Sequence, residues 1–105
     1  MSQDSICQVT VSGDRCTISV RGRFDYNHNS DFRRAMEQAL ASPTAREFVV
    51  DLSQTEYLDS SALGTLLVLD DAAKAVGKKV VLSKASGLAK QMLDVAKFDT
   101  VFEMR

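Results

Sequence analysis

The sequence switches repeatedly between runs of β-forming residues and stretches with helical spacing, and this alternation constrains the fold more than any other feature. Apolar residues at 32, 35, 36, 39 and 40 have the spacing of an amphipathic helix, with Asn and Ser residues available upstream as caps. A short apolar strand follows at 48–50, then a helical stretch that runs to Val76 before Gly77. Next come a strand at 78–84, a helix at 86–97 and a short strand within 98–104. Strands separated by helices predict a partly parallel α/β sheet.

The start of the chain predicts an antiparallel hairpin. Two alternating segments flank the pair Gly13-Asp14, which is typical of a tight turn. Counting outward from the turn pairs positions 11, 9 and 7 with positions 16, 18 and 20, and places all six apolar side chains on one face. Cys7 and Cys16 then point toward the core without facing each other, so a disulfide is not expected. The hairpin makes the predicted sheet mixed rather than purely parallel.

Size and charge narrow the class of protein. A chain of 105 residues, 45% hydrophobic and 26% charged, fits one compact domain, and we assign residues 1–105 to it. The formal charge of -1 lacks the strong positive field expected for a nucleic-acid or anionic-membrane partner. The first residues do not have the pattern of a secretory signal, and no segment approaches the ~20 apolar residues that span a bilayer. We therefore expect a cytoplasmic protein without direct nucleic-acid or membrane partners.

Residue patterns typical of enzymes are weak. The single histidine, His28, lies in a polar NHNS segment, and the two cysteines lack metal or redox spacing. Asp70 and Asp71 point about 100° apart on a helix, which makes a poor metal pair. No glycine-rich phosphate-binding motif occurs. We predict no catalytic residue, metal or cofactor; a small thiol enzyme that uses one of the cysteines is the alternative from another class.

The helix after residue 59 has two distinct faces. Ala62, Leu66, Leu69, Ala73 and Val76 form the predicted core stripe, and Asp70, Asp71 and Lys74 mark the solvent side. In the first two turns the outward face is apolar: Gly64, Leu67 and Val68 project outward and Leu63 lies at the border. Neighbouring elements could cover these residues, or the four could form a protein-docking patch. In the third predicted helix, Leu88, Met92, Val95 and Ala96 are expected to supply apolar contacts.

The segment YLDSSALG at 57–64 places hydroxyl groups at the start of this helix. Asp59, Ser60 or Ser61 could cap the helix by accepting a hydrogen bond from a free backbone N–H. A helix start also favours negative charge, so a phosphate would be tolerated there. Beside an apolar docking patch, that phosphate would oppose a partner shaped for the neutral hydroxyl. The pattern therefore indicates a serine switch as well as a cap.

Four motifs together resemble the STAS domain of bacterial anti-sigma factor antagonists. They are GRFD at 22–25, VVDLS at 49–53, YLDSSALG at 57–64 and FDTVF at 98–102, in the same order over nearly the whole chain. The resemblance implies a mixed β-sheet with helices packed against it, and a partner-switching role without catalysis.

The resemblance also implies site residues and partners. Ser60 would be phosphorylated by an ATP-using anti-sigma serine kinase and restored by a PP2C-type phosphatase, and Asp25, Asp59 and Ser61 would line or support the phosphorylation site. The unphosphorylated protein would bind the kinase and free its sequestered partner, commonly a sigma factor. Ala62 stands where the family commonly has glycine. A non-switching STAS subunit of a transporter or scaffold is the alternative, in which Ser60 is only structural.

Overall fold

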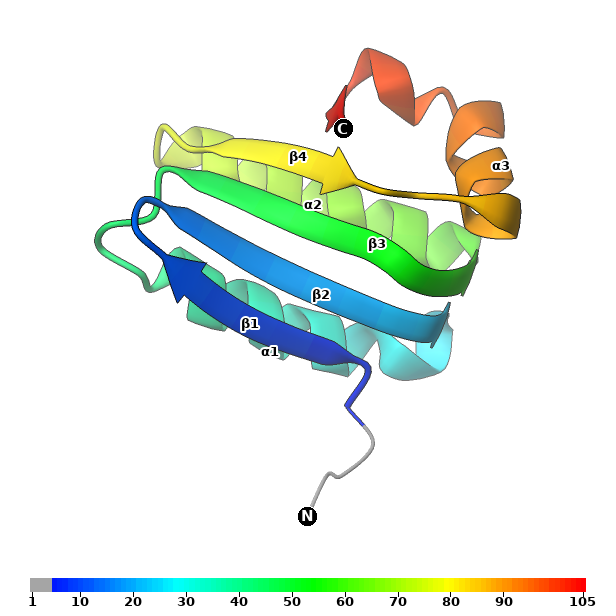
Figure 1. Ribbon diagram of the computed structural model, residues 1–105, viewed down its shortest axis with the longest axis horizontal. Coiled ribbons are helices and arrows are strands. Elements are labelled where there is room, and N and C mark those ends of the chain that lie inside the picture. Colours follow the sequence, from blue (N-terminus) through cyan, green and yellow to red (C-terminus); the bar gives the residue numbers. More distant parts are fainter. Residues whose placement is uncertain (1–4) are drawn as a thin grey trace.

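One five-stranded mixed sheet organises the protein, in a computed structural model that describes residues 5–105 (Figure 1). The strand order is β1-β2-β3-β4-β5; β1 and β2 are antiparallel, and each later strand pairs in parallel with the one before it. The strands are β1 Cys7–Ser12, β2 Arg15–Phe24, β3 Glu47–Leu58, β4 Lys79–Ser83 and β5 Glu103–Met104. The helices are α1 Asn29–Leu40, α2 Ser60–Ala75 and α3 Gly87–Val95, with short 3-10 helices η1 Tyr26–His28 and η2 Phe98–Thr100. The predicted mixed α/β architecture is confirmed.

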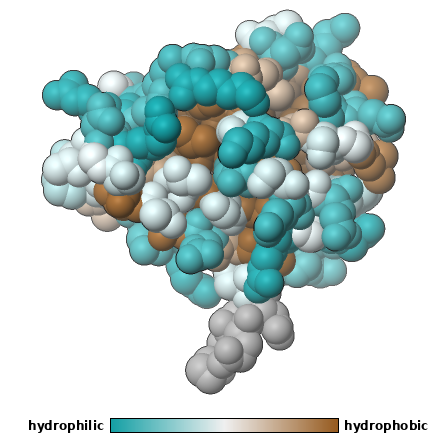
Figure 2. Space-filling view, viewed as in Figure 1, coloured by the Kyte–Doolittle hydropathy of each residue, from teal (hydrophilic) through white to brown (hydrophobic). Residues whose placement is uncertain are grey.

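The layers follow from this connectivity. Figure 1 shows α1 and α2 together on one face of the sheet, while the other face of β1 to β4 is uncovered. The core lies between the sheet and these helices, and the rings of Phe24 in β2 and Phe32 in α1 stack there at 5.0 Å. Figure 2 shows the uncovered face, where polar residues predominate and apolar residues appear between them. A sheet with one packed and one polar face explains the alternating pattern of β2.

The hairpin has the register that the turn predicts. Positions 7, 9 and 11 pair with positions 20, 18 and 16. Cys16 is fully buried, but Cys7 is only half-buried and Val11 keeps 51% of its surface exposed. Cys7 and Val9 still pack against the core as partly buried residues, so among the apolar side chains of β1 only Val11 is left exposed. The reason is that β1 is an edge strand, so neighbours cover its side chains from one side only.

Strand β3 is much longer than the predicted segment at 48–50 and continues through polar residues to Leu58. The β2–β3 register shifts between Ser19 and Arg21 and again between Gly22 and Arg23. At the first shift, the buried Thr55 hydroxyl donates a hydrogen bond of 2.8 Å to the Val20 carbonyl oxygen, which keeps this strand segment attached. The extension brings the end of β3 beside the end of β2.

The first two helices occupy their predicted positions. Four of the five predicted α1 core residues are buried: Phe32, Ala35, Met36 and Ala39. The Asn and Ser caps are not used, because His28 occupies the N-cap position and makes no side-chain cap hydrogen bond. In α2, the stripe Ala62, Leu66, Leu69 and Ala73 is buried as predicted.

Two α2 predictions are wrong. Val76 is 58% exposed, because the helix ends at Ala75 and the chain turns away. Asp70 is only 6% exposed instead of solvated; β4 and the C-terminal segment approach it, and its carboxylate pairs with Lys74 at 2.9 Å.

Helix α3 turns to the core a face that only partly overlaps the predicted one, because Met92 is the one predicted contact residue that packs against the core. Ala89 and Leu93 are buried, whereas Leu88 is 49% exposed and Val95 is 84% exposed. Both stripes have helical spacing, so periodicity alone could not choose between them. The end of the chain also differs from the predicted strand: η2 precedes a β5 of only two residues.

Candidate functional site

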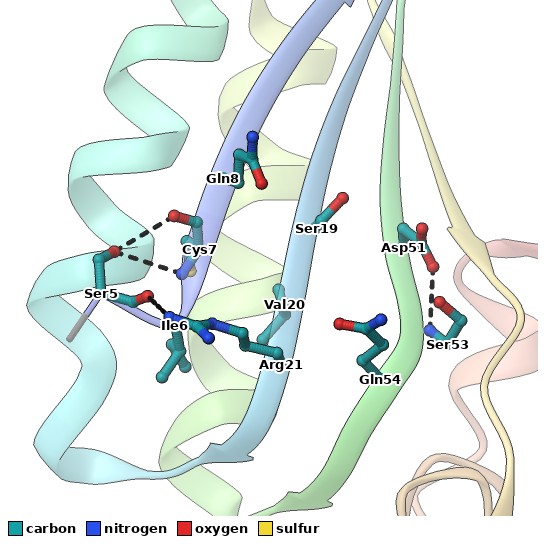
Figure 3. A pocket seen from close by; sticks show the side chains of 10 residues that line it. All are labelled: Ser5, Ile6, Cys7, Gln8, Ser19, Val20, Arg21, Asp51, Ser53 and Gln54. Atoms are coloured by element: carbon teal, nitrogen blue, oxygen red, sulfur yellow. Dashed lines mark hydrogen bonds between the residues drawn. The ribbon is translucent and has the colours of Figure 1, made fainter. Parts of the chain in front are cut away.

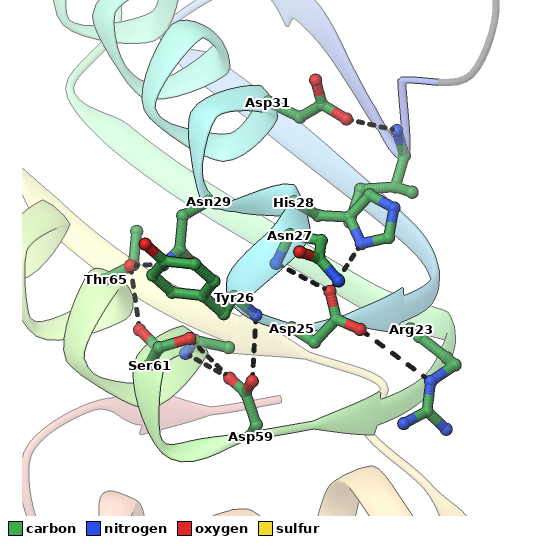
Figure 4. Close-up of polar contacts among 12 residues, drawn as sticks. Arg23, Asp25, Tyr26, Asn27, His28, Asn29, Asp31, Asp59, Ser61 and Thr65 are labelled. Carbon is green, nitrogen blue, oxygen red and sulfur yellow. Dashed lines mark hydrogen bonds and ion pairs between the residues drawn. The ribbon is translucent and has the colours of Figure 1, made fainter.

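The carboxylate of Asp59 is the centre of a hydrogen-bond network at the start of α2 (Figure 4). One oxygen, Oδ1, accepts hydrogen bonds from the Ala62 N–H at 2.9 Å and the Ser61 hydroxyl at 2.7 Å. The other oxygen, Oδ2, accepts a hydrogen bond of 2.9 Å from the Tyr26 N–H. Of the three residues that the sequence offered as the cap of α2, Asp59 is the one that caps it.

This network favours the ionised form of Asp59. Desolvation by burial raises the pKa of its carboxyl group, but the hydrogen bonds from Ala62, Ser61 and Tyr26 lower it and together prevail. The net result is a pKa below the ordinary value for aspartate. The start of α2 therefore already holds one negative charge, directly before the two serines.

The two serines have different surroundings. Ser60 is the first residue of α2 and is exposed to solvent. Ser61 is half-buried, and its hydroxyl donates to Asp59. Ser60 is therefore accessible to another protein, whereas the hydroxyl of Ser61 is engaged in holding the cap.

Asp25 organises the neighbouring loop between β2 and α1. Its Oδ1 accepts a hydrogen bond of 3.1 Å from the Asn27 N–H and lies 2.8 Å from His28 Nδ1. Arg23 Nε lies 4.0 Å from its Oδ2. These contacts fold the loop into η1. Tyr26, which directly follows Asp25, then donates a hydrogen bond from its N–H to Asp59. Asp25 therefore holds the loop that carries Tyr26.

A second link joins α1 to the first turn of α2. The hydroxyl of the buried Thr65 lies 2.9 Å from the Ser61 carbonyl oxygen and 3.2 Å from Asn29 Oδ1. Sequence reasoning missed the contributions of Tyr26, His28, Asn29 and Thr65. The polar NHNS segment was a visible signal, but nothing in the sequence identified what it contacts.

The proposed docking patch starts one turn after Ser60. Gly64 is exposed, and Leu67 and Val68 are 39% and 41% exposed. Leu63 is half-buried and packs against the core. In this structure the outward face of α2 is thus accessible over its first two turns. Leu63 lies at the border of this face and packs against the core.

A shallow hollow on the uncovered sheet face is the main alternative site (Figure 3). It is lined by polar groups from β1 to β3, among them Gln8, Ser19, Arg21, Asp51 and Gln54. Arg21 donates a hydrogen bond of 3.2 Å to the Ser5 carbonyl oxygen, and Asp51 accepts one of 2.9 Å from the Ser53 N–H. Both charged residues of its lining are thus engaged in hydrogen bonds within the fold.

The cysteines do not have the surroundings of reactive thiols. Burial raises the pKa of Cys7 to about 12, with a smaller contribution from the nearby Asp31 carboxylate. Burial also raises the pKa of Cys16, which Lys78 lowers in part. Because the thiolate is the nucleophile, raised pKa values disfavour a thiol enzyme.

Within residues 5–105, the His, Cys, Asp and Glu side chains form no group of three or more that could hold a metal ion. In the same range, none of the helices combines the length and apolarity needed to cross a membrane.

Residues 7–104 match the profile of a protein family described as "Mlab, STAS domain". A STAS-domain containing protein of Pseudomonas aeruginosa (strain UCBPP-PA14) is 38% identical over 95 residues, which cover 90% of this chain and 92% of that relative. The match spans nearly the full length of both proteins.

Solved structures share the fold at lower identity. The anti-sigma factor antagonist SpoIIAA in its unphosphorylated form superposes with a TM-score of 0.73 at 20% identity, covering 94% of this chain and 86% of SpoIIAA. The phosphorylated form of Bacillus SpoIIAA gives 0.70 at 16% identity, covering 94% and 90%. A sulfate transporter family protein from Wolinella succinogenes gives 0.73 at 14% identity, covering 88% and 74%.

Proposed function

The chain belongs to the STAS-domain family, and from this premise we propose that it is an anti-sigma factor antagonist that acts by partner switching. In its unphosphorylated form it binds an anti-sigma serine kinase in the cytoplasm and releases the partner that the kinase sequesters. Phosphorylation of Ser60 blocks this binding, and a PP2C-type phosphatase restores it. The chain itself contributes a recognition surface, with no catalysis and no cofactor of its own.

The different surroundings of Ser60 and Ser61 carry this proposal. An exposed hydroxyl at the first position of α2 is open to a kinase, and its neighbour is bound to Asp59. A phosphate on Ser60 would add about -1.5 to -2 charges at pH 7. The free N–H groups and the dipole of the helix start favour such a charge, which lets the fold accept it.

The same charge opposes docking. A partner that covers Gly64, Leu67 and Val68 would have to desolvate the phosphate one turn away, next to the ionised Asp59. The fold therefore tolerates the modified state, whereas the interface does not. This difference is what a reversible switch requires.

A second function has support from the fold similarity to the sulfate transporter family protein. In that case the chain would be a non-switching subunit of a transporter or scaffold. Ser60 would then begin the helix without being modified, and binding would not depend on its charge.

The two functions are separated by intact-mass measurement after incubation with candidate anti-sigma serine kinases and ATP. We expect one phosphate on the wild-type protein, none on Ser60→Ala and one on Ser61→Ala. The phosphorylated wild-type protein should bind the kinase more weakly than the unphosphorylated protein in a titration. Ser60→Asp should also bind more weakly, because it places a negative charge at the same position. Equal affinity of the two wild-type forms would refute charge-controlled switching.

A further inference from the structure

Tyr26 is unusual among the aromatic residues of this protein. The chain has five Phe and two Tyr, and all lie within the described residues. The five Phe side chains are buried, and Tyr57 is half-buried with the Arg23 guanidinium 4.1 Å from its ring centre. Tyr26 alone is mostly exposed, at 75%. A ring that contributes nothing to the core is free to contact another molecule.

The backbone beneath this ring is held from both sides. The Tyr26 N–H donates to Asp59 Oδ2 at 2.9 Å, and its carbonyl oxygen accepts a hydrogen bond from the Asn29 N–H. On the preceding residue, the Asp25 carbonyl accepts a hydrogen bond of 2.9 Å from the His28 N–H. An exposed aromatic side chain on a fixed backbone loses little conformational entropy on binding, which is a property of interface anchors.

The position of Tyr26, close to the start of α2, indicates which partner would contact its ring. Figure 4 shows the Tyr26 N–H donating a hydrogen bond to Asp59, and Asp59 directly precedes Ser60 in the sequence. A protein kinase that brings its active site to the Ser60 hydroxyl covers an area far larger than the separation of these residues, since a typical interface buries about 800 Å² on each partner. A kinase surface of this size around Ser60 would also reach Tyr26.

We infer that Tyr26 is an aromatic anchor for the anti-sigma serine kinase, which receives the ring in an apolar pocket beside its active site. This inference rests on the proposed function and adds a specificity-determining residue from the β2–α1 loop to the surface on α2. The docking surface then has two parts, the ring of Tyr26 and the apolar start of α2, with Ser60 next to Asp59 at their junction.

The test uses the full chain and a purified anti-sigma serine kinase selected because it phosphorylates this chain at Ser60. Tyr26→Ala removes the ring, and Tyr26→Phe keeps the ring while removing the hydroxyl. Val95→Ala is the matched control, because Val95 is 84% exposed and lies on α3. Thermal unfolding of each variant reports any loss of folding.

We expect Tyr26→Ala to raise the dissociation constant roughly 10- to 30-fold, as removal of an anchor residue does. The KM for phosphorylation should rise with little change in kcat, because the ring contributes binding that is equal in the ground and transition states. Tyr26→Phe and Val95→Ala should stay within about threefold of the wild-type protein.

Each other outcome counts against the inference in a distinct way. If Tyr26→Ala binds like wild type while phosphorylation of Ser60 still releases the kinase, the anchor is disproved and the proposed function stands. If Tyr26→Phe loses as much affinity as Tyr26→Ala, the hydroxyl is recognised and an apolar pocket is ruled out. If no anti-sigma serine kinase modifies Ser60, the proposed function fails and the inference fails with it.

Discussion

The carboxylate of Asp59 accepts a hydrogen bond of 2.9 Å from the backbone N–H of Tyr26, a residue 33 positions earlier in the chain. The same carboxylate caps α2 through Ala62. One side chain therefore fixes the β2–α1 loop against the first turn of the helix that carries Ser60. This contact relates the local sequence at the serines to a distant segment, and its removal should affect both.

Replacement of Asp59 by alanine should lower the free energy of unfolding by about 1–2 kcal/mol, because α2 loses its N-cap and the loop loses its acceptor. Asp59→Asn keeps one carbonyl acceptor and should lose less. Urea unfolding at pH 7 measures both values. Equal stability of Asp59→Ala and the wild type would mean that the cap is not needed.

Lowering the pH should reduce the stability of the fold through the protonation of Asp59. Because the pKa of Asp59 is lower in the folded protein than the ordinary value of about 3.9 expected for the unfolded chain, the ionised carboxylate stabilises the fold. This contribution is fully present above about pH 4 and is lost as the pH falls through the folded pKa. Calorimetry from pH 7 to pH 3 should show a smaller loss of Tm for Asp59→Asn than for the wild type. Parallel curves would contradict this assignment.

The hydrogen bond from Thr55 to Val20 should be needed where the β2–β3 register shifts. Thr55→Val has nearly the same shape but leaves the Val20 carbonyl without this donor, so we expect a loss of about 1–2 kcal/mol in the free energy of unfolding. Thr55→Ser retains the hydroxyl and is the control for the lost methyl group. Chemical denaturation measures the free energy of unfolding of the wild type and both variants. A Thr55→Val variant more stable than Thr55→Ser would argue against a stabilising hydrogen bond.

Lys97 follows the end of α3 with a φ of 59°, in the left-handed region that favours glycine. Lys97→Gly should therefore raise the free energy of unfolding by about 0.5–1 kcal/mol. Lys90→Gly, at an exposed position inside α3, should lower it by about 1 kcal/mol. The opposite signs of these two changes, measured by thermal unfolding, form the test; a loss in both would show that the backbone at Lys97 is unstrained.

The thiols should react slowly in the folded protein. A Cys7 pKa of about 12 leaves roughly a thousandfold less thiolate than an ordinary cysteine, and Cys16 is fully buried. Labelling with a disulfide reagent at pH 8 should therefore be much slower in buffer than in denaturant. Rapid native labelling of either residue would restore the thiol-enzyme alternative.

Much of the fold was readable from the sequence where local pattern and turn chemistry agree. The pair Gly13-Asp14 fixes the β1–β2 register, because a two-residue turn leaves only one way to pair the alternating residues beside it. The stripe from Ala62 to Ala73 places α2, because one face of that helix is far more apolar than the other at the correct period. Helix α3 offered two apolar stripes of similar quality, and the choice of Ala89 and Leu93 was made by packing against the sheet.

The candidate site also has one part that the sequence predicts and one part that only the tertiary structure determines. The order Asp59, Ser60, Ser61 at the start of a helix is local, so the sequence alone indicated that the N-cap of α2 and a neighbouring serine lie within these three residues, without deciding which residue is the cap. It could not determine that Tyr26 would reach Asp59 or that Thr65 would lie 3.2 Å from Asn29 Oδ1, 36 positions away. Those contacts exist because β2 and β3 run in parallel and end side by side at Phe24 and Leu58. Pairing between distant strands is decided by the energy of the whole packed sheet, and no local pattern contains that information.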